Sequence, residues 1–317
     1  ISPGGLDQRA VLPWRPGIGC EFFSADRDRQ RRSERYGGGG LLDSLRRRVD
    51  PILTTMRVII PTDLEGISGV VVFEQTRDRG ALYEEARRLL MGDVNATVEG
   101  CLEAGATDVV VRDDHGGGFN FVPELMHRGA RYLTGAGRPR PSETPEVYEG
   151  FDAAILLGYH AKQGTRDGLL HHTQSSVGGN RYWYNGLESG EIAQTALMLG
   201  HFGTKVVMVA GDTQTCDETN AFLGPAVTTV STKVGISQQY GFLDAPAAVH
   251  DRLREGARSA VSQAASCAIY TTDLPIHGRL QFPDVTRADA FRPRLAQRVD
   301  DTAYEAEFST ALHVYDF

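Results

Sequence analysis

Four short apolar segments of this 317-residue chain each end abruptly in polar residues and glycine, and this repetition constrains the fold more than any other feature. The segments are residues 58–60, 109–111, 153–157 and 206–210. Between the first two, residues 82–104 carry apolar side chains at three- to four-residue spacing, which predicts an amphipathic helix that ends at Gly105. We therefore predict an α/β fold, a three-layer sandwich with a mainly parallel sheet, in which ligands bind at the carboxyl ends of the strands.

The first apolar segment ends in two carboxylates, Asp63 and Glu65, which are followed by Gly66 and Gly69. In extended backbone, residues two apart face the same way, so the two carboxylates are expected to converge. Two like charges at one point repel each other unless a cation or a shared proton lies between them. A solvated turn after an edge strand is the alternative, and for an isolated Asp-x-Glu-Gly it is the better one.

The other three segments repeat the pattern, which favours a binding site over a solvated turn. The second ends in Asp113-Asp114-His115 and three glycines, the third in Gly158-Tyr159-His160, and the fourth in Gly211-Asp212. The carboxyl ends of parallel strands share one edge of a sheet, so these polar residues are predicted to lie together. Because the loops of any α/β protein are polar, the pattern indicates the fold class more strongly than it indicates a site.

Composition excludes several classes of protein. The formal net charge of −8 argues against nucleic acid as a general partner, because phosphate binding requires a basic face. No apolar stretch approaches the roughly 20 residues of a membrane span. Cysteines stand at 20, 101, 216 and 267, without the spacing of a zinc knuckle or the density of a disulfide scaffold. They are predicted to be buried thiols of a cytoplasmic protein.

Residues 1–55 differ in composition from the rest of the chain. They hold ten arginines, seven acidic residues, no lysine and a run of four glycines, without helical or strand periodicity. So few apolar side chains do not offset the entropy of ordering a segment, so we expect disorder there. Our interpretation is that Met56 is the functional start and that residues 56–317 form the catalytic unit; loss of folding or activity on deleting residues 1–55 would contradict it.

A second informative region lies between the third and fourth apolar segments. Residues 180–187 predict a β-hairpin, because Asn185-Gly186 tolerates the positive φ angles of a type I′ turn. Ser189 is the expected N-cap of a following helix that has Glu191 in its first turn, where the helix dipole favours a negative charge. Before the hairpin stand His171 and His172, of which only one is expected to face a given site, because adjacent side chains point in different directions.

The chain from Met56 to Phe317 resembles the DppA-type D-aminopeptidases, a family of zinc metallopeptidases. Thr62-Asp63-Leu64-Glu65-Gly66 is similar to the family's Ser-x-Asp-x-Glu-Gly element, and Asp113-Asp114-His115 to its Asp-Ser-His. Further matching segments are Leu157-Gly158-Tyr159-His160-Ala161, Val209-Ala210-Gly211-Asp212, Gly190-Glu191 and Lys233-x-x-Ile236-Ser237. The departures are Thr62 and Thr173 in place of serine, and one residue inserted between His160 and Gly168.

The resemblance implies a set of site residues. The implied metal ligands are Asp63, Glu65, His115, His160 and Glu191. His172 matches the family's catalytic histidine, although the inserted residue leaves His171 as an alternative. Asp113 is expected to support His115 or the substrate amine, and Lys233 to contact the reacting group or a substrate carboxylate, an ordinary surface lysine being the alternative for Lys233. Structural roles are expected for the remaining five histidines, His127, His201, His250, His277 and His313, and for Cys216.

The implied ligand set agrees with coordination chemistry. Two tetrahedral zinc ions have about eight ligand positions. If Asp63 bridges both ions it fills two positions, the other four residues fill four, and a bridging water or hydroxide fills the last two. Such a centre supplies hydroxide near neutral pH and polarises a carbonyl, while His172 supplies positive charge or transfers a proton. Nitrogen and oxygen ligands do not exclude manganese, cobalt or iron.

By resemblance, the leading function is a zinc-dependent aminopeptidase that acts on short peptides with an N-terminal D-residue and assembles as a ring-like homo-oligomer. The alternatives are another binuclear amidohydrolase or L-aminopeptidase on the same scaffold, and a metal-binding accessory protein for peptide uptake that lacks hydrolysis. We expect the later part of the chain to add a smaller α+β portion, which includes a helix over residues 247–265 and strands near 280–282 and 304–308. The aromatic hairpin Tyr182-Trp183-Tyr184 is expected either to make a subunit contact or to line the site.

Overall fold

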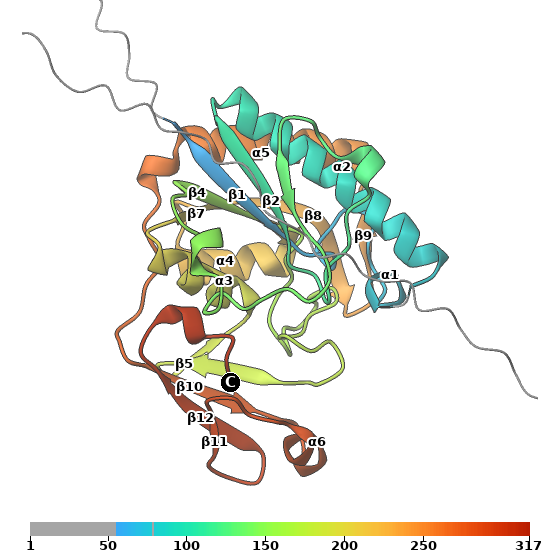
Figure 1. Ribbon diagram of the computed structural model, residues 1–317. Coiled ribbons are helices and arrows are strands. Elements are labelled where there is room, and N and C mark those ends of the chain that lie inside the picture. The colour runs from blue at the N-terminus through green and yellow to red at the C-terminus, as the bar shows by residue number, and fades with distance from the viewer. Residues whose placement is uncertain (1–54, 78) are drawn as a thin grey trace, which may run out of the picture. The chain divides into compact units, whose positions relative to one another are not determined.

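The computed structural model describes residues 55–77 and 79–317, so the predicted disorder of residues 1–55 lies almost wholly outside the described residues. A seven-stranded sheet forms the centre of the described chain, in the order β3-β2-β1-β4-β7-β8-β9 (Figure 1). All its strands are parallel except the last, β9, which pairs antiparallel with β8. The strands are β1 (Arg57–Thr62), β2 (Asp108–Asp113), β3 (Arg131–Leu133), β4 (Ala153–Leu157), β7 (Lys205–Asp212), β8 (Thr228–Ser237) and β9 (Tyr240–Leu243).

Helices cover both faces of this sheet, which confirms the predicted α/β sandwich (Figure 1). The long helices α2 and α5 pack side by side on one face, and α3 and α4 lie on the other. The helices are α1 (Glu74–Arg77), α2 (Ala81–Glu103), α3 (Glu191–His201), α4 (Thr213–Leu223), α5 (Pro246–Ser262) and α6 (Val285–Ala290). The predicted helices over 82–104 and 247–265 are thus confirmed, the second ending earlier and followed by a short 3₁₀ turn, Ala264–Ser266.

The central strands consist of apolar runs because the sheet is buried from both sides. All five residues of β4 are fully buried, as are Val58, Ile59 and Ile60 of β1. Polar side chains can reach open space only at or just beyond the carboxyl ends of these strands. The core therefore forces the chemistry of the chain to the strand ends.

A second, antiparallel sheet has the order β11-β12-β10-β5-β6 and its own apolar core. Its strands are β5 (Arg181–Tyr184), β6 (Leu187–Ser189), β10 (Ile276–Gln281), β11 (Gln297–Arg298) and β12 (Ala303–Phe308). The predicted hairpin is confirmed as β5–β6, with φ of 49° at Asn185 and 80° at Gly186. The hairpin thus joins the C-terminal strands, so this portion is assembled from two separate segments of the chain.

Two details of this region differ from the sequence-based predictions. Ser189 is the last residue of β6 and does not cap α3, because Gly190 occupies the N-cap position. Tyr182 and Tyr184 are buried in the core of their own sheet, so of the aromatic hairpin only Trp183 can take part in a subunit contact.

Two further expectations concern membrane-spanning helices and the cysteines. Within residues 55–77 and 79–317, no helix combines the length and the apolar character that crossing a membrane requires. Cys101 and Cys267 are buried free thiols and Cys216 is a half-buried one, as predicted, whereas Cys20 lies outside the described residues.

Candidate metal centre

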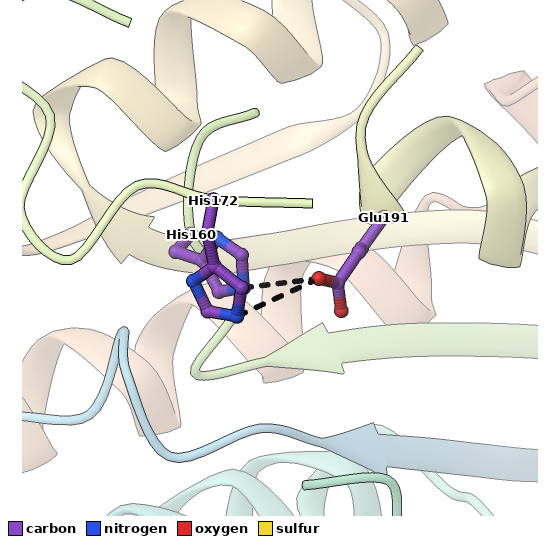
Figure 2. A group of neighbouring side chains, drawn as sticks. All are labelled: His160, His172 and Glu191. Atoms are coloured by element: carbon purple, nitrogen blue, oxygen red, sulfur yellow. Dashed lines mark ion pairs between the residues drawn. The ribbon is translucent and has the colours of Figure 1, made fainter. Parts of the chain in front are cut away.

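The six site residues implied by the resemblance come together at the carboxyl edge of the large sheet. In the sheet, β1 lies between β2 and β4. The chain runs from β1 to β2 on one side and later returns to β4 on the other side, and such a change of direction leaves a crevice at the carboxyl end of β1. Residues from the ends of these three strands meet there with the first residue of α3 and a loop residue. They are Asp63 and Glu65 after β1, His115 after β2, His160 after β4, Glu191 at the start of α3, and His172. Figure 2 shows three of them, His160, His172 and Glu191.

The carboxylate of Asp63 lies between two histidines. Its Oδ1 is 2.8 Å from Nδ1 of His115, and its Oδ2 is 3.3 Å from Nε2 of His160. On the outer sides, Glu65 Oε2 is 3.0 Å from the same nitrogen of His115, and Glu191 Oε1 is 3.5 Å from that of His160. Asp63 thus presents one oxygen to each of the two histidines.

Backbone hydrogen bonds between neighbouring strand ends fix this geometry. Asp63 donates its N–H to the carbonyl of Leu157 at 2.8 Å, and Gly66 donates to that of Gly158 at 2.7 Å. A Cβ on Gly66 would lie 2.0 Å from the carbonyl oxygen of Tyr159, so only glycine fits there. The predicted convergence of the two carboxylates is confirmed, although β1 ends at Thr62 and the backbone turns beyond it.

The three histidines are oriented from behind by backbone carbonyls. His115 Nε2 lies 2.8 Å from the oxygen of Thr76, and Nδ1 of His160 lies 3.0 Å from that of Ala161. Nδ1 of His172 lies 2.8 Å from the oxygen of Leu170. Carbonyls only accept, so these ring nitrogens carry the proton and the opposite nitrogens turn their lone pairs to the centre, as metal-bound histidines do.

Two buried atoms at the centre lack a hydrogen-bond partner among the described residues. They are Oε2 of Glu65 and Nε2 of His160, each on a side chain almost completely buried. An acceptor oxygen and a nitrogen lone pair facing one another repel unless a cation lies between them. The residues present therefore fit divalent metal ions of the kind that takes nitrogen and oxygen ligands.

The pKa values within the cluster are shifted by the close contacts between its carboxylates and histidines. Burial alone would raise the pKa of Asp63, but the hydrogen bonds of His115 and His160 hold it well below its ordinary value. Burial alone would lower the pKa of these two histidines, yet the facing carboxylates of Glu65 and Glu191 raise it well above the usual range.

The paired histidines turn to different sides, as predicted. The ring of His172 stacks on that of His160, with centroids 4.0 Å apart, and its Nε2 is 3.8 Å from Glu191 Oε1 (Figure 2). Nδ1 of His171 instead accepts the N–H of Gly164 at 3.0 Å. Burial, and then the positive charge of His160, lower the pKa of His172, so its ring is neutral.

The loop that carries His172 is tied to the turn between β8 and β9. Leu170 donates its N–H to the carbonyl of Gln238 at 2.8 Å, and the Gln238 side chain returns a hydrogen bond to the carbonyl of His171 at 3.0 Å. The loop is therefore positioned by the edge of the large sheet and not only by its own turns.

The ligand atoms form two overlapping groups. One contains Asp63, Glu65 and His160, and the other His160, His172 and Glu191, with the atoms of each group within 4.8 Å of one another. His115 joins the first group through its short contacts with Asp63 and Glu65. His172 thus lies within reach of a metal as well as of a substrate.

The family model for D-aminopeptidases matches residues 56–317. The chain belongs to this family. It is 32% identical over 186 residues to the D-aminopeptidase of Bacillus subtilis (strain 168), a match that spans 58% of this chain and 65% of that protein. Its fold is similar to the solved structure described as "Zn-dependent D-aminopeptidase DppA from Bacillus subtilis, a self-compartmentalizing protease", with a TM-score of 0.75 and 25% identity over 82% of this chain and 94% of that one.

Two residues expected near the centre of this family member have other contacts. Asp113 faces away from the His115 ring: its carboxylate accepts hydrogen bonds from Thr134 and from the backbone and side chain of Asn120, at 2.7–2.8 Å. The Asn120 amide also donates to the carbonyl of His115 at 2.9 Å. Asp113 therefore supports His115 through Asn120 and the loop backbone, while its expected role toward the substrate amine stays a prediction.

Lys233 is neither a surface lysine nor a member of the cluster. It is 2% exposed, and its ammonium donates hydrogen bonds to the carbonyls of Glu65, Ile67 and Val70. Burial lowers its pKa to about 8. Lys233 thus holds the turn that follows β1 and positions Glu65 through the backbone.

The centre opens into a cavity of about 680 Å³. Asp63, Glu65, His115, His172 and Glu191 are among the residues that line it. The lining also contains residues to which the sequence analysis assigned no role: Arg112, Asp114, Arg138, Tyr159, Thr195 and Tyr315. The alternation Arg112-x-Asp114 at the end of β2 was the available signal, since it places both side chains on one face. We call these six residues the arginine wall.

Proposed function

We propose that this protein is a metal-dependent aminopeptidase that hydrolyses short peptides with an N-terminal D-residue at a binuclear zinc centre. The observation that carries the proposal is the pair of overlapping ligand groups that share His160, with Asp63 between two histidines. Membership of the D-aminopeptidase family and similarity to a structure described as zinc-dependent support the chemistry.

The five residues that would hold the ions are Asp63, Glu65, His115, His160 and Glu191. When bound, zinc supplies a Lewis acid and lowers the pKa of water, which is the chemistry that amide hydrolysis needs. The carbonyl contacts of His115 and His160 fix which ring nitrogen of each faces the cluster and would be available to an ion. Asp63 would offer one oxygen beside each of two histidines.

His172 has the role of proton transfer or charge stabilisation at the bond being cleaved. Its Nε2 faces the cavity while Nδ1 donates to Leu170, so its ring is oriented without help from a metal. A neutral imidazole in this position can accept a proton and return it to the leaving amine.

The decisive experiment is a matched set of dipeptide assays on the full chain. We expect hydrolysis of D-alanyl-D-alanine, loss of activity with a chelator, and recovery with zinc, together with about two metal ions per chain by elemental analysis. Faster hydrolysis of L-alanyl-L-alanine would favour an L-aminopeptidase. Metal binding without hydrolysis of either dipeptide would favour the uptake accessory protein.

We also propose that the protein assembles as a homo-oligomer through the β8–β9 hairpin. The similar solved structure is described as a self-compartmentalizing protease. In this chain, the end of β8 and β9 expose five large apolar side chains, namely Val234, Ile236, Tyr240, Phe242 and Leu243. So dense an apolar patch on an edge strand is typical of an interface.

Light scattering tests this assembly. The wild type should form a particle much larger than the 34.6 kDa monomer. Phe242→Ser should shift it toward smaller species, whereas Leu187→Ser, which changes an exposed apolar residue of the other sheet, should leave it unchanged. A monomeric wild type at micromolar concentration would contradict the proposal.

A further inference from the structure

The arginine wall contains a buried cation with one acidic partner. Arg112 is 5% exposed, borders the cavity, and packs its guanidinium against the ring of Tyr148 at 4.6 Å. Within residues 55–77 and 79–317 its guanidinium forms one ion pair, with Asp114 Oδ1 at 3.0 Å. A guanidinium has five N–H donors, so one such pair leaves donors for a further acceptor.

A second arginine competes for the same carboxylate. Arg138 lies 3.6 Å from Asp114 Oδ1, donates to the carbonyl of Asp113 at 2.8 Å, and keeps 34% of its side chain exposed. Tyr159 approaches the other oxygen of Asp114, at 3.4 Å. Two cations thus face one anion, which leaves this wall with an excess positive charge next to open space.

The wall and the metal centre line the same cavity of about 680 Å³. A space of this size is typical of small-ligand sites and accommodates a dipeptide. Thr195 connects the two regions, because it lies one helical turn after Glu191 on α3 and its Oγ1 is 3.1 Å from the hydroxyl of Tyr159, which approaches Asp114. A peptide whose scissile amide lies at the metal centre can therefore extend along the cavity toward the arginines.

We propose that Arg112 and Arg138 bind a carboxylate of the peptide substrate on the C-terminal side of the cleaved bond. The proposal rests on the proposed peptidase function and specifies its substrate class: short peptides with a negative charge one residue beyond the amide. Two sources have this chemistry, the terminal carboxylate of a dipeptide and an acidic side chain. The planar guanidinium fork matches either one.

Kinetics on a matched pair of substrates test the proposal. The wild type with zinc should hydrolyse D-alanylglycine with a kcat/KM at least 10-fold above that of D-alanylglycinamide, the order of one charge-assisted hydrogen bond. Arg138→Gln should remove most of this preference by slowing the acid only. Arg131→Gln is the matched control, because this exposed arginine pairs with Asp108 outside the cavity and its loss changes the net charge equally.

Arg112→Lys provides a second variant with the charge retained. It should reduce the preference as well, because an ammonium lacks the bidentate fork. A wild type that cleaves the acid and the amide equally well would overturn the proposal, as would two arginine variants with an unchanged preference. D-alanyl-L-aspartic acid α-amide identifies the source: cleavage as fast as that of D-alanylglycine assigns the side-chain carboxylate, and cleavage as slow as that of the amide assigns the terminal one.

Calorimetry on the metal-free protein separates this proposal from the proposed function. The wild type and Arg131→Gln should bind D-alanylglycine more tightly than D-alanylglycinamide. Arg138→Gln should bind both dipeptides with the same low affinity. If zinc-loaded protein cleaves no peptide but this binding pattern holds, the peptidase assignment fails and the carboxylate site stands. Equal binding of acid and amide to the wild type rejects the site whatever the activity.

Discussion

The metal centre and the arginine wall line one cavity and carry opposite charges. The metal centre contains the carboxylates of Asp63, Glu65 and Glu191, and it buries one atom each of Glu65 and His160 without a hydrogen-bond partner. On the wall, two arginines, Arg112 and Arg138, pair with the single carboxylate of Asp114. A cation is expected to complete the first region and an anion the second. The comparison teaches that the balance of charged side chains within one cavity indicates which kind of ligand each part binds.

The largest expected effect separates the two sides by metal content. His160→Ala removes the nitrogen shared by both ligand groups, so metal occupancy should fall and kcat should drop about 10³-fold or more, as expected when a catalytic metal is lost. Glu191→Ala should act in the same direction, whereas Arg138→Gln should keep full occupancy. Elemental analysis of the purified variants measures this difference. Full metal content in both ligand variants would show that the ligands are wrongly assigned.

The next effect tests a residue that touches both the metal centre and the cavity. His172→Ala should retain the metal and the fold but lose about 10²-fold in kcat, because proton transfer or charge stabilisation is lost. His171→Ala should cost far less, since its ring bonds to Gly164 outside the cluster. Metal analysis with steady-state kinetics decides the assignment. Metal loss in the His172 variant would make it a ligand, and an inactive His171 variant beside an active His172 variant would reverse the roles.

A smaller effect concerns the support behind the metal centre. Lys233→Met leaves the carbonyls of Glu65, Ile67 and Val70 without their donor, so the free energy of unfolding should fall by about 2 kcal/mol. Urea denaturation of the metal-free protein measures it. Lys205→Met is the control, because that half-buried lysine has only long contacts of 3.3–3.4 Å to carbonyls. An unchanged midpoint for Lys233→Met would show that the turn after β1 is stable without these hydrogen bonds.

The smallest effect lies on the arginine wall. Thr195 Oγ1 lies 3.1 Å from the hydroxyl of Tyr159 and 2.9 Å from that of Tyr315. Thr195→Val keeps the shape and removes these bonds, so KM should rise about threefold, equivalent to roughly 0.7 kcal/mol, with kcat and metal content unchanged. Initial-rate measurements resolve this change. A fall in kcat at constant KM would place Thr195 with the metal centre.

The sequence predicted the metal centre better than the arginine wall, for a physical reason. Asp63, His115 and His160 directly follow apolar strands, and strand ends of a parallel sheet meet at a known edge. Arg138, Thr195 and Tyr315 come from a loop, a helix interior and the chain's last residues, and only the folded chain brings them together.

Two residues show where local reasoning stops. Asp113 was expected to support His115, and the link runs through Asn120 and the loop backbone, a contact that sequence spacing alone does not reveal. The position of Lys233 was open because a lysine donating to three carbonyls is specified by a turn 166 residues away in the chain. The fold class depends on repeated local patterns and was predictable.

The hydrogen bonds between Gln238 and the loop of His171 and His172 imply that the activity of the protein depends on its concentration. Gln238 lies in the turn of the β8–β9 hairpin, whose apolar face is the proposed contact between subunits. Anything that orders this hairpin also orders the loop, and by reciprocity a ligand on the loop strengthens assembly. Specific activity should then rise with protein concentration, and dilution alone would act as an off switch.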